Sequence, residues 1–153
     1  NARHVVALDV GRGQLDWRLR NDSRVTVMEG TNARYLTPDD FPVSLRAFSC
    51  ITIDVSFISL KLILPVLPPL LAANSDIAAL VKPQFEAGRS EVGKGGIVRD
   101  PIIHARVVEE VIAAADTLGL RHMSTTASPI LGAEGNREFF LHLRDRNRTK
   151  PDA

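Results

Sequence analysis

The sequence predicts an α/β fold with a mainly parallel sheet. Three apolar runs have the length of strands and each ends in a charged residue: 5–8 before Asp9, 50–53 before Asp54, and 77–81 before Lys82. Continuous apolar runs are typical of parallel strands, and helix-like or loop segments separate these three. The last connection leaves no room for a helix, so we expect an antiparallel last strand.

Shorter segments complete this pattern. A helix is expected at 14–20 and another in the first half of 56–73, where prolines must interrupt it. We expect loops at 35–45, with at most one helical turn, and at 87–98, which is long and mobile because it contains four glycines. The remaining strands are expected at 25–28, 122–126 and 138–143.

The strongest helix signal begins at Asp100. This residue can cap a helix, and Pro101 suits the first helical position. An apolar stripe follows at helical spacing, and Gly119 is a natural end. The stripe consists of Ile103, Val107, Val111, Ala114 and Leu118.

Length and composition are those of one globular domain. The chain has 153 residues, 44% of them hydrophobic, and a net charge of +1, so any basic patch must be local. We expect the domain at 1–143 and a polar, basic, disordered tail at 144–153. Cys50 lies in an apolar run and is expected to be a buried small hydrophobe rather than a nucleophile.

Several classes of protein are disfavoured. The four histidines and the one cysteine show no metal-ligand spacing, so no metal is expected. The apolar stretch 62–73 is short and contains three prolines, so it does not predict a membrane span. A single cysteine suits a reducing compartment such as the cytoplasm. The chain has no initiator methionine and starts close to a strand, which we interpret as a fragment of a longer protein.

Asp54 and Lys82 are the first candidates for chemistry. They end consecutive predicted strands, which places them about one strand spacing apart at the same edge of the sheet. Ligands of open α/β sheets bind at this edge. Two interpretations stay open: a structural ion pair, or a functional lysine beside a carboxylate. Glu138, at the start of the last strand, is a candidate third member.

Asp9 is the second candidate. It ends the first strand, where doubly wound folds place an acid that hydrogen-bonds a ribose. No glycine-rich fingerprint precedes it here, although such a motif accompanies that acid in dinucleotide folds. Ribose binding and simple capping of a turn both remain open.

Several long motifs together resemble the TlyA family of ribosomal RNA methyltransferases, sometimes labelled hemolysins, which have the FtsJ-like fold. The likeness runs from about Val5 to Leu143. Its motifs are DVGRGQL at 9–15, TNAR at 31–34, IDVSFISL at 53–60, VKPQFE at 81–86, GKGGIVRDP at 93–101 and GNREF at 135–139. The resemblance implies a Rossmann-like, S-adenosylmethionine-dependent enzyme that methylates a ribose 2′-hydroxyl in ribosomal RNA.

The resemblance also implies roles for individual residues. Enzymes of this fold use a Lys-Asp-Lys-Glu tetrad, in which Asp54, Lys82 and Glu138 match the aspartate, the second lysine and the glutamate. Lys82 would be the base or would orient the attacking hydroxyl. The residues implied in binding S-adenosylmethionine are Asp9, Val10, Thr31, Asn32 and Asp54.

The implied partner is ribosomal RNA or a ribosomal subunit. Arg89, Lys94 and Arg99 of the glycine-rich loop flank the candidate site and could contact RNA, or could simply be solvated. The alternative is a hemolysin-like, membrane-active protein or a non-catalytic RNA-binding protein. The predicted helix after Asp100 carries too many acidic residues for a membrane-binding helix. The sequence does not predict an oligomeric state.

The chain departs from the family before Val5. A glycine-rich first motif, an earlier tetrad lysine and a small RNA-binding domain would all precede that residue. The first strand of the sheet, which would lie between the strands ending at Asp9 and Asp54, is therefore missing, and each of those strands should have an unpaired edge.

We therefore expect the 153-residue chain to bind S-adenosylmethionine weakly or not at all, and to have no activity by itself. Isothermal titration of the chain with S-adenosylmethionine checks the first expectation. A dissociation constant in the micromolar range would contradict it.

Overall fold

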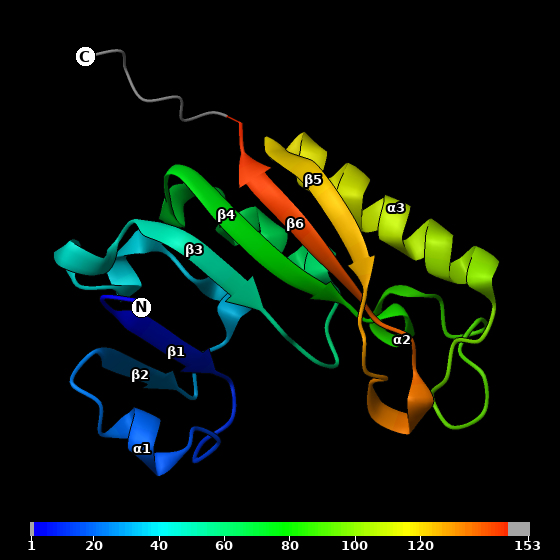
Figure 1. Ribbon diagram of the computed structural model, residues 1–153, viewed down its shortest axis with the longest axis horizontal. Helices are drawn as coiled ribbons and strands as arrows, with labels where there is room; N and C mark the ends of the chain where they lie inside the picture. The colour runs from blue at the N-terminus through cyan, green and yellow to red at the C-terminus, as the bar shows by residue number, and fades with distance from the viewer. Residues whose placement is uncertain (1, 147–153) are drawn as a thin grey trace. The chain divides into compact units, whose positions relative to one another are not determined.

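The computed structural model describes residues 2–146, and the chain divides into two compact units, Asn1–Leu36 and Thr37–Ala153. Each unit has its own sheet, with strand order β1-β2 in the first and β3-β4-β6-β5 in the second (Figure 1).

The first unit is a small parallel β-α-β arrangement. Strand β1 (Val5–Asp9) pairs with β2 (Val25–Glu29), and the register ends with Asp9 opposite Glu29. The predicted helix at 14–20 is shorter than expected: α1 spans Trp17–Arg20. Asp16 defines its start, because its side chain accepts a hydrogen bond from the amide of Arg18.

The second unit confirms the mainly parallel sheet with an antiparallel last strand. Strands β3 (Phe48–Ile53) and β4 (Leu71–Val81) are parallel, and β6 (Phe139–Asp145) is antiparallel both to β4 and to β5 (Leu120–Ala127). Strand β6 continues two residues beyond the predicted end of the domain at 143. The rest of the predicted tail, 147–153, lies outside the described residues.

The proline-rich segment differs from its prediction. Instead of an interrupted α-helix it forms three successive 3-10 turns: η4 (Leu60–Leu62), η5 (Leu64–Val66) and η6 (Pro68–Leu70). Proline lacks the amide proton that a continuous helix needs, so only single turns form. The segment predicted as a loop at 35–45 contains two more such turns, η2 (Pro38–Asp40) and η3 (Val43–Leu45), after η1 (Ala33–Tyr35).

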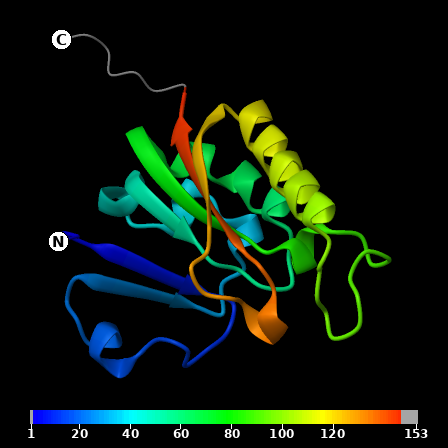
Figure 2. The same ribbon diagram turned by 45° about the vertical axis from the view of Figure 1, so that its right-hand side comes forward.

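Helix α3 (Pro101–Thr117) starts where the sequence predicts. The carboxylate of Asp100 accepts from the amide of Ile102 at 2.8 Å. The helix runs alongside β5 (Figures 1 and 2). Its buried residues are His104, Val107, Val108, Val111 and Ala115. The predicted burial of the stripe is therefore confirmed for Val107 and Val111, whereas Ile103, Ala114 and Leu118 are only half-buried.

The core of the second unit lies on one face of its central strands. Ile77 and Ala79 of β4 stand opposite Leu143 and Leu141 of β6, and all four are fully buried. Leu60, Leu64 and Leu70 of the 3-10 turns are buried as well. The short turns thus supply core side chains despite their irregular backbone.

Cys50 is exposed, so the prediction of a buried small hydrophobe is wrong. Among residues 2–146, the one ladder partner of β3 is β4, and that of β1 is β2. Each strand therefore has an unpaired edge, as predicted. A side chain on an edge strand has a neighbouring strand on one side only, which leaves Cys50 accessible.

Replacement of the cap Asp100 by alanine should lower the free energy of unfolding by about 1 kcal/mol, because the amide of Ile102 loses its acceptor. Asp100→Asn keeps an acceptor oxygen and should cost much less. Urea unfolding of the chain and its two variants measures this. Equal losses of unfolding free energy in both variants would show that the hydrogen bond of the cap does not account for the effect.

Candidate functional site

Three strands of the second unit bring Asp54, Lys82 and Glu138 to the same end of their sheet. Asp54 follows β3, Lys82 follows β4, and Glu138 precedes β6. The last ladder pair of β4 and β6 is Val81 with Phe139, so Glu138 comes next to Lys82 in the antiparallel register. Figure 1 shows the end of β4 and the start of β6 at one edge of the sheet.

Lys82 is the best-defined side chain of this edge. Its Nζ lies 2.7 Å from Oδ1 of Asp54 and donates to Oγ of Ser56 at 3.0 Å. The Lys82 side chain is 14% exposed, whereas that of Asp54 is 70% exposed. An ammonium has three donors, and two are used here. The ion pair therefore exists, and it leaves Lys82 one donor for a further oxygen.

Glu138 is buried on the other side of β4. Its Oε1 accepts from Nε2 of Gln84 at 3.1 Å. A Cβ at Gly132 would lie only 2.2 Å from that same Oε1, so glycine is needed there for the close approach. The Oε1 of Gln84 is itself buried and has no hydrogen-bond partner among residues 2–146. Gln84, which the sequence did not single out, thus brings a free acceptor to the site.

Helix α2 (Pro83–Glu86) is clamped to the loop that follows β3. The rings of Phe85 and Phe57 are 5.0 Å apart, and Glu86 accepts from Oγ of Ser59 at 2.5 Å and from the amide of Leu60 at 2.7 Å. Together with the two contacts of Lys82, these interactions join 82–86 to 54–60 along their whole length. We call this set of contacts the α2 clamp.

Two members of the α2 clamp have unusual environments. Burial raises the pKa of the Glu86 carboxyl, although the hydrogen bonds from Ser59 and Leu60 oppose the shift. Phe57 has a φ of 62° and is 90% exposed. A bulky residue in the left-handed region is strained, and such strain concentrates at functional sites. Sequence reasoning missed both roles, because neither residue has a distinctive spacing.

The predicted cofactor residues of the first unit gather at the carboxyl end of its parallel sheet. The Oδ1 of Asp9 accepts from the amide of Gly11 at 2.6 Å, and the Asp9 carbonyl accepts from the amide of Thr31 at 3.1 Å. Asp9 therefore caps its turn, and its second carboxylate oxygen accepts no hydrogen bond from residues 2–146. Val10 beside it is 72% exposed, and Asn32 accepts from the amide of Arg34.

The predicted RNA-binding residues lie in the loop between α2 and α3. Arg89, Lys94 and Arg99 are exposed and, within residues 2–146, form no ion pair. The loop itself is held by Asn136, whose side chain accepts from the amide of Val98 and donates to the carbonyl of Gly96. The predicted loop is therefore tied to the turn before β6.

Two features are absent from residues 2–146. No group of three or more His, Cys, Asp or Glu side chains is arranged to hold a metal ion. No helix in that range combines the length and apolar character needed to cross a membrane.

Comparison with known proteins places the chain among methyltransferases. Residues 1–145 match the FtsJ-like methyltransferase family. YqxC of Bacillus subtilis, provisionally named an rRNA methyltransferase, is 56% identical over 93% of this chain and 50% of its own length. The 16S/23S rRNA (cytidine-2′-O)-methyltransferase TlyA of Mycobacterium tuberculosis is 50% identical over 94% of this chain and 52% of its own. The chain thus spans about half the length of the curated relatives it matches.

Solved structures agree on the fold. A hemolysin-named protein from Lactococcus lactis superposes with a TM-score of 0.91 at 49% identity, covering 97% of this chain and 70% of that one. The N-methyltransferase NodS of Bradyrhizobium japonicum has 12% identity and a TM-score of 0.59 over 93% of this chain and 66% of its own. The predicted Rossmann-like methyltransferase fold is confirmed.

The α2 clamp gives a prediction about stability and pH. Folding raises the Glu86 pKa, so the folded chain holds this proton more tightly than the unfolded chain. This contribution is fully present below the unfolded pKa and is lost as pH rises through the folded pKa. Glu86→Gln cannot ionise. As the pH rises above the ordinary pKa of a glutamate, the free energy of unfolding of Glu86→Gln should therefore increase relative to that of the wild type.

Glu86→Ala is the matched variant, because it removes both acceptors. It should lose about 1–3 kcal/mol across the same pH range, since the amide of buried Leu60 is left unpaired. Urea unfolding at several pH values measures both variants. The assignment fails if Glu86→Gln and Glu86→Ala lose equal stability, or if the wild-type difference from Glu86→Gln does not change with pH.

Proposed function

Because the chain belongs to the FtsJ-like methyltransferase family, we propose that it is the catalytic part of an S-adenosylmethionine-dependent enzyme that methylates a ribose 2′-hydroxyl in ribosomal RNA. The observation that carries this proposal is the position of Lys82, nearly buried and held between Asp54 and Ser56. A second observation in its favour is Glu138, which precedes β6 on the other side of β4. These three residues are the proposed catalytic residues.

The contacts of Lys82 favour an orienting role. The third ammonium donor, not used by Asp54 or Ser56, can hold the oxygen of the substrate hydroxyl. Asp54 is exposed and has a second carboxylate oxygen through which the proton of that hydroxyl can reach water. Buried Glu138 accepts a hydrogen bond from Gln84, the second residue of α2, and so ties this helix to the start of β6.

The residues of the first unit fit the proposed cofactor. When bound, S-adenosylmethionine supplies an electrophilic methyl group on a sulfonium sulfur. The free oxygen of Asp9 can accept from ribose hydroxyls, and the exposed Val10 offers an apolar surface to an adenine ring. Thr31 and Asn32, at the carboxyl end of β2, are proposed to bind the cofactor as well. Asp54 of the second unit is proposed as a cofactor residue from the resemblance to the family.

The proposed substrate follows the names of the relatives. TlyA of Mycobacterium tuberculosis is named a 16S/23S rRNA (cytidine-2′-O)-methyltransferase, so we propose a cytidine ribose in ribosomal RNA for this chain as well. Arg89, Lys94 and Arg99 have no acidic partner in residues 2–146 and are proposed RNA contacts. A protein with this substrate works in the cytoplasm, where ribosomes are.

The hemolysin-like alternative has less support. An amphipathic helix that binds a membrane needs an unoccupied apolar face. The apolar face of α3 is buried in its own unit, with Val107 and Val111 fully enclosed. The hemolysin name of the Lactococcus lactis protein applies to that protein, and no described side chain favours that activity here.

Lys82→Ala in the full-length protein should reduce methyl transfer to purified ribosomal subunits by roughly 10²-fold or more, because it removes the group that positions the hydroxyl. Lys61→Ala is the matched control, since Lys61 is also paired with a carboxylate, that of Glu110, but lies outside the proposed site. Transfer of labelled methyl groups measures both. Unchanged transfer by Lys82→Ala would refute the role.

A further inference from the structure

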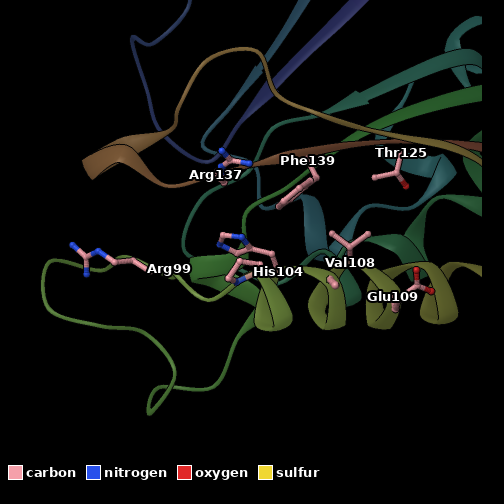
Figure 3. A pocket seen from close by; sticks show the side chains of 9 residues that line it. Arg99, His104, Val108, Glu109, Thr125, Arg137 and Phe139 are labelled. Carbon is pink, nitrogen blue, oxygen red and sulfur yellow. The ribbon is translucent and has the colours of Figure 1, made fainter.

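A groove of about 630 Å³ lies between the first half of α3 and the strands β5 and β6 (Figure 3). The proposed chemistry does not use it. Such a volume is in the range of sites that hold a small ligand or one unit of a polymer. The groove is lined by Arg99, Pro101, His104, Ala105, Val108, Glu109, Thr125, Arg137 and Phe139.

The two ends of the groove differ in charge. Arg99 and Arg137 lie toward one end, and Glu109 and Thr125 toward the other (Figure 3). Within residues 2–146, none of the three charged side chains forms an ion pair. Unpaired guanidinium groups are the donors that proteins use most for phosphate. The groove therefore suits a ligand with an anion at one end and hydrogen-bond donors at the other.

The middle of the groove is aromatic. The rings of His104 and Phe139 are 5.7 Å apart, and Nε2 of His104 lies 2.8 Å from the carbonyl of Val98. A carbonyl only accepts, so Nε2 of His104 donates this hydrogen bond and fixes the orientation of the ring. An aromatic surface beside arginines is typical of sites that stack an unpaired base.

The groove is also close in the chain to the proposed catalytic edge. Arg137 and Phe139 flank Glu138, and side chains alternate along an extended segment. Glu138 points to Gln84, while its two neighbours line the groove. One short segment therefore serves two surfaces, one proposed for chemistry and one for a ligand next to it.

We propose that the groove binds one nucleotide of the RNA strand next to the methylated one. Its phosphate lies at Arg99 and Arg137, its base lies against Phe139, and its polar edge faces Thr125 and Glu109. This inference rests on the proposed function, because it takes RNA as the substrate. It adds Arg137 and Phe139 to the proposed RNA contacts.

Binding of a fluorescent cytidine octaribonucleotide to the full-length protein, without cofactor, tests the groove by anisotropy. Arg137→Ala should weaken binding about tenfold and reduce the slope of log K against log salt by about one. Arg121→Ala is the matched control, because Arg121 on β5 is exposed, forms no ion pair within residues 2–146 and does not line the groove. It should change binding less than about twofold.

Phe139→Leu separates stacking from charge. It keeps an apolar side chain in the fold, and it should weaken binding severalfold without changing the salt slope. The proposed role of the groove would be wrong if Arg137→Ala and Arg121→Ala lost equal affinity for the RNA. It would also be wrong if both Arg137→Ala and Phe139→Leu bound the RNA as tightly as the wild type. If RNA binding depends on Arg137 but the wild type transfers no methyl group to ribosomal subunits, RNA binding in the groove is supported and the proposed methyl transfer is wrong.

Discussion

The second unit depends on the need to neutralise a lysine that is almost buried. Removing an ammonium group from water costs several kcal/mol unless an opposite charge and hydrogen bonds replace the water. Asp54 and Ser56 meet this need from a loop 26 residues earlier in the chain. Strand β3 must therefore lie beside β4 in one register, while β6 pairs with the other side of β4.

The α2 clamp extends the same constraint over seven residues of the loop. The backbone of Phe57 is held in a strained conformation, which costs of order 1–3 kcal/mol. The loop is kept in place by the ring of Phe85, which contacts Phe57, and by the carboxylate of Glu86, which accepts from the amide of Leu60. Gln84 carries a different cost: its buried Oε1 has no hydrogen-bond partner in the described part of the chain. The strained Phe57 lies on the loop after β3 and the unpaired acceptor of Gln84 lies on α2, so each of the two segments that the α2 clamp joins carries one of these features. This concentration is what a binding site shows before its ligand is present.

Local signals in the sequence predicted the strands, the cap at Asp100 and the antiparallel last strand, because these depend on neighbouring residues. The 3-10 turns were missed because proline shows where a helix stops but not what replaces it. Cys50 was misplaced because an apolar run does not show that its strand is an edge. Local signals could not have identified Glu86 or Gln84, because their hydrogen-bond partners are distant in the chain. Leu60 lies 26 residues from Glu86, and Glu138 lies 54 residues from Gln84. The need for glycine at 132 depends on the exact path of a turn.

The distribution of charge connects the fold to its proposed partner. A net charge of +1 suggests little attraction for RNA, but the cations of the second unit are not equivalent. Arg46, Lys61, Arg106, Arg144 and Arg146 are each paired with a carboxylate. Arg89, Lys94, Arg99 and Arg137 have no such partner in residues 2–146, and all four lie in the loop before α3 or the turn before β6. Asn136 ties these two segments together. Apart from Arg121 on β5, the unpaired positive charge of the second unit within residues 2–146 is therefore local and is held on an ordered frame. A local charge of this kind lets a nearly neutral protein attract a polyanion to one edge of its sheet.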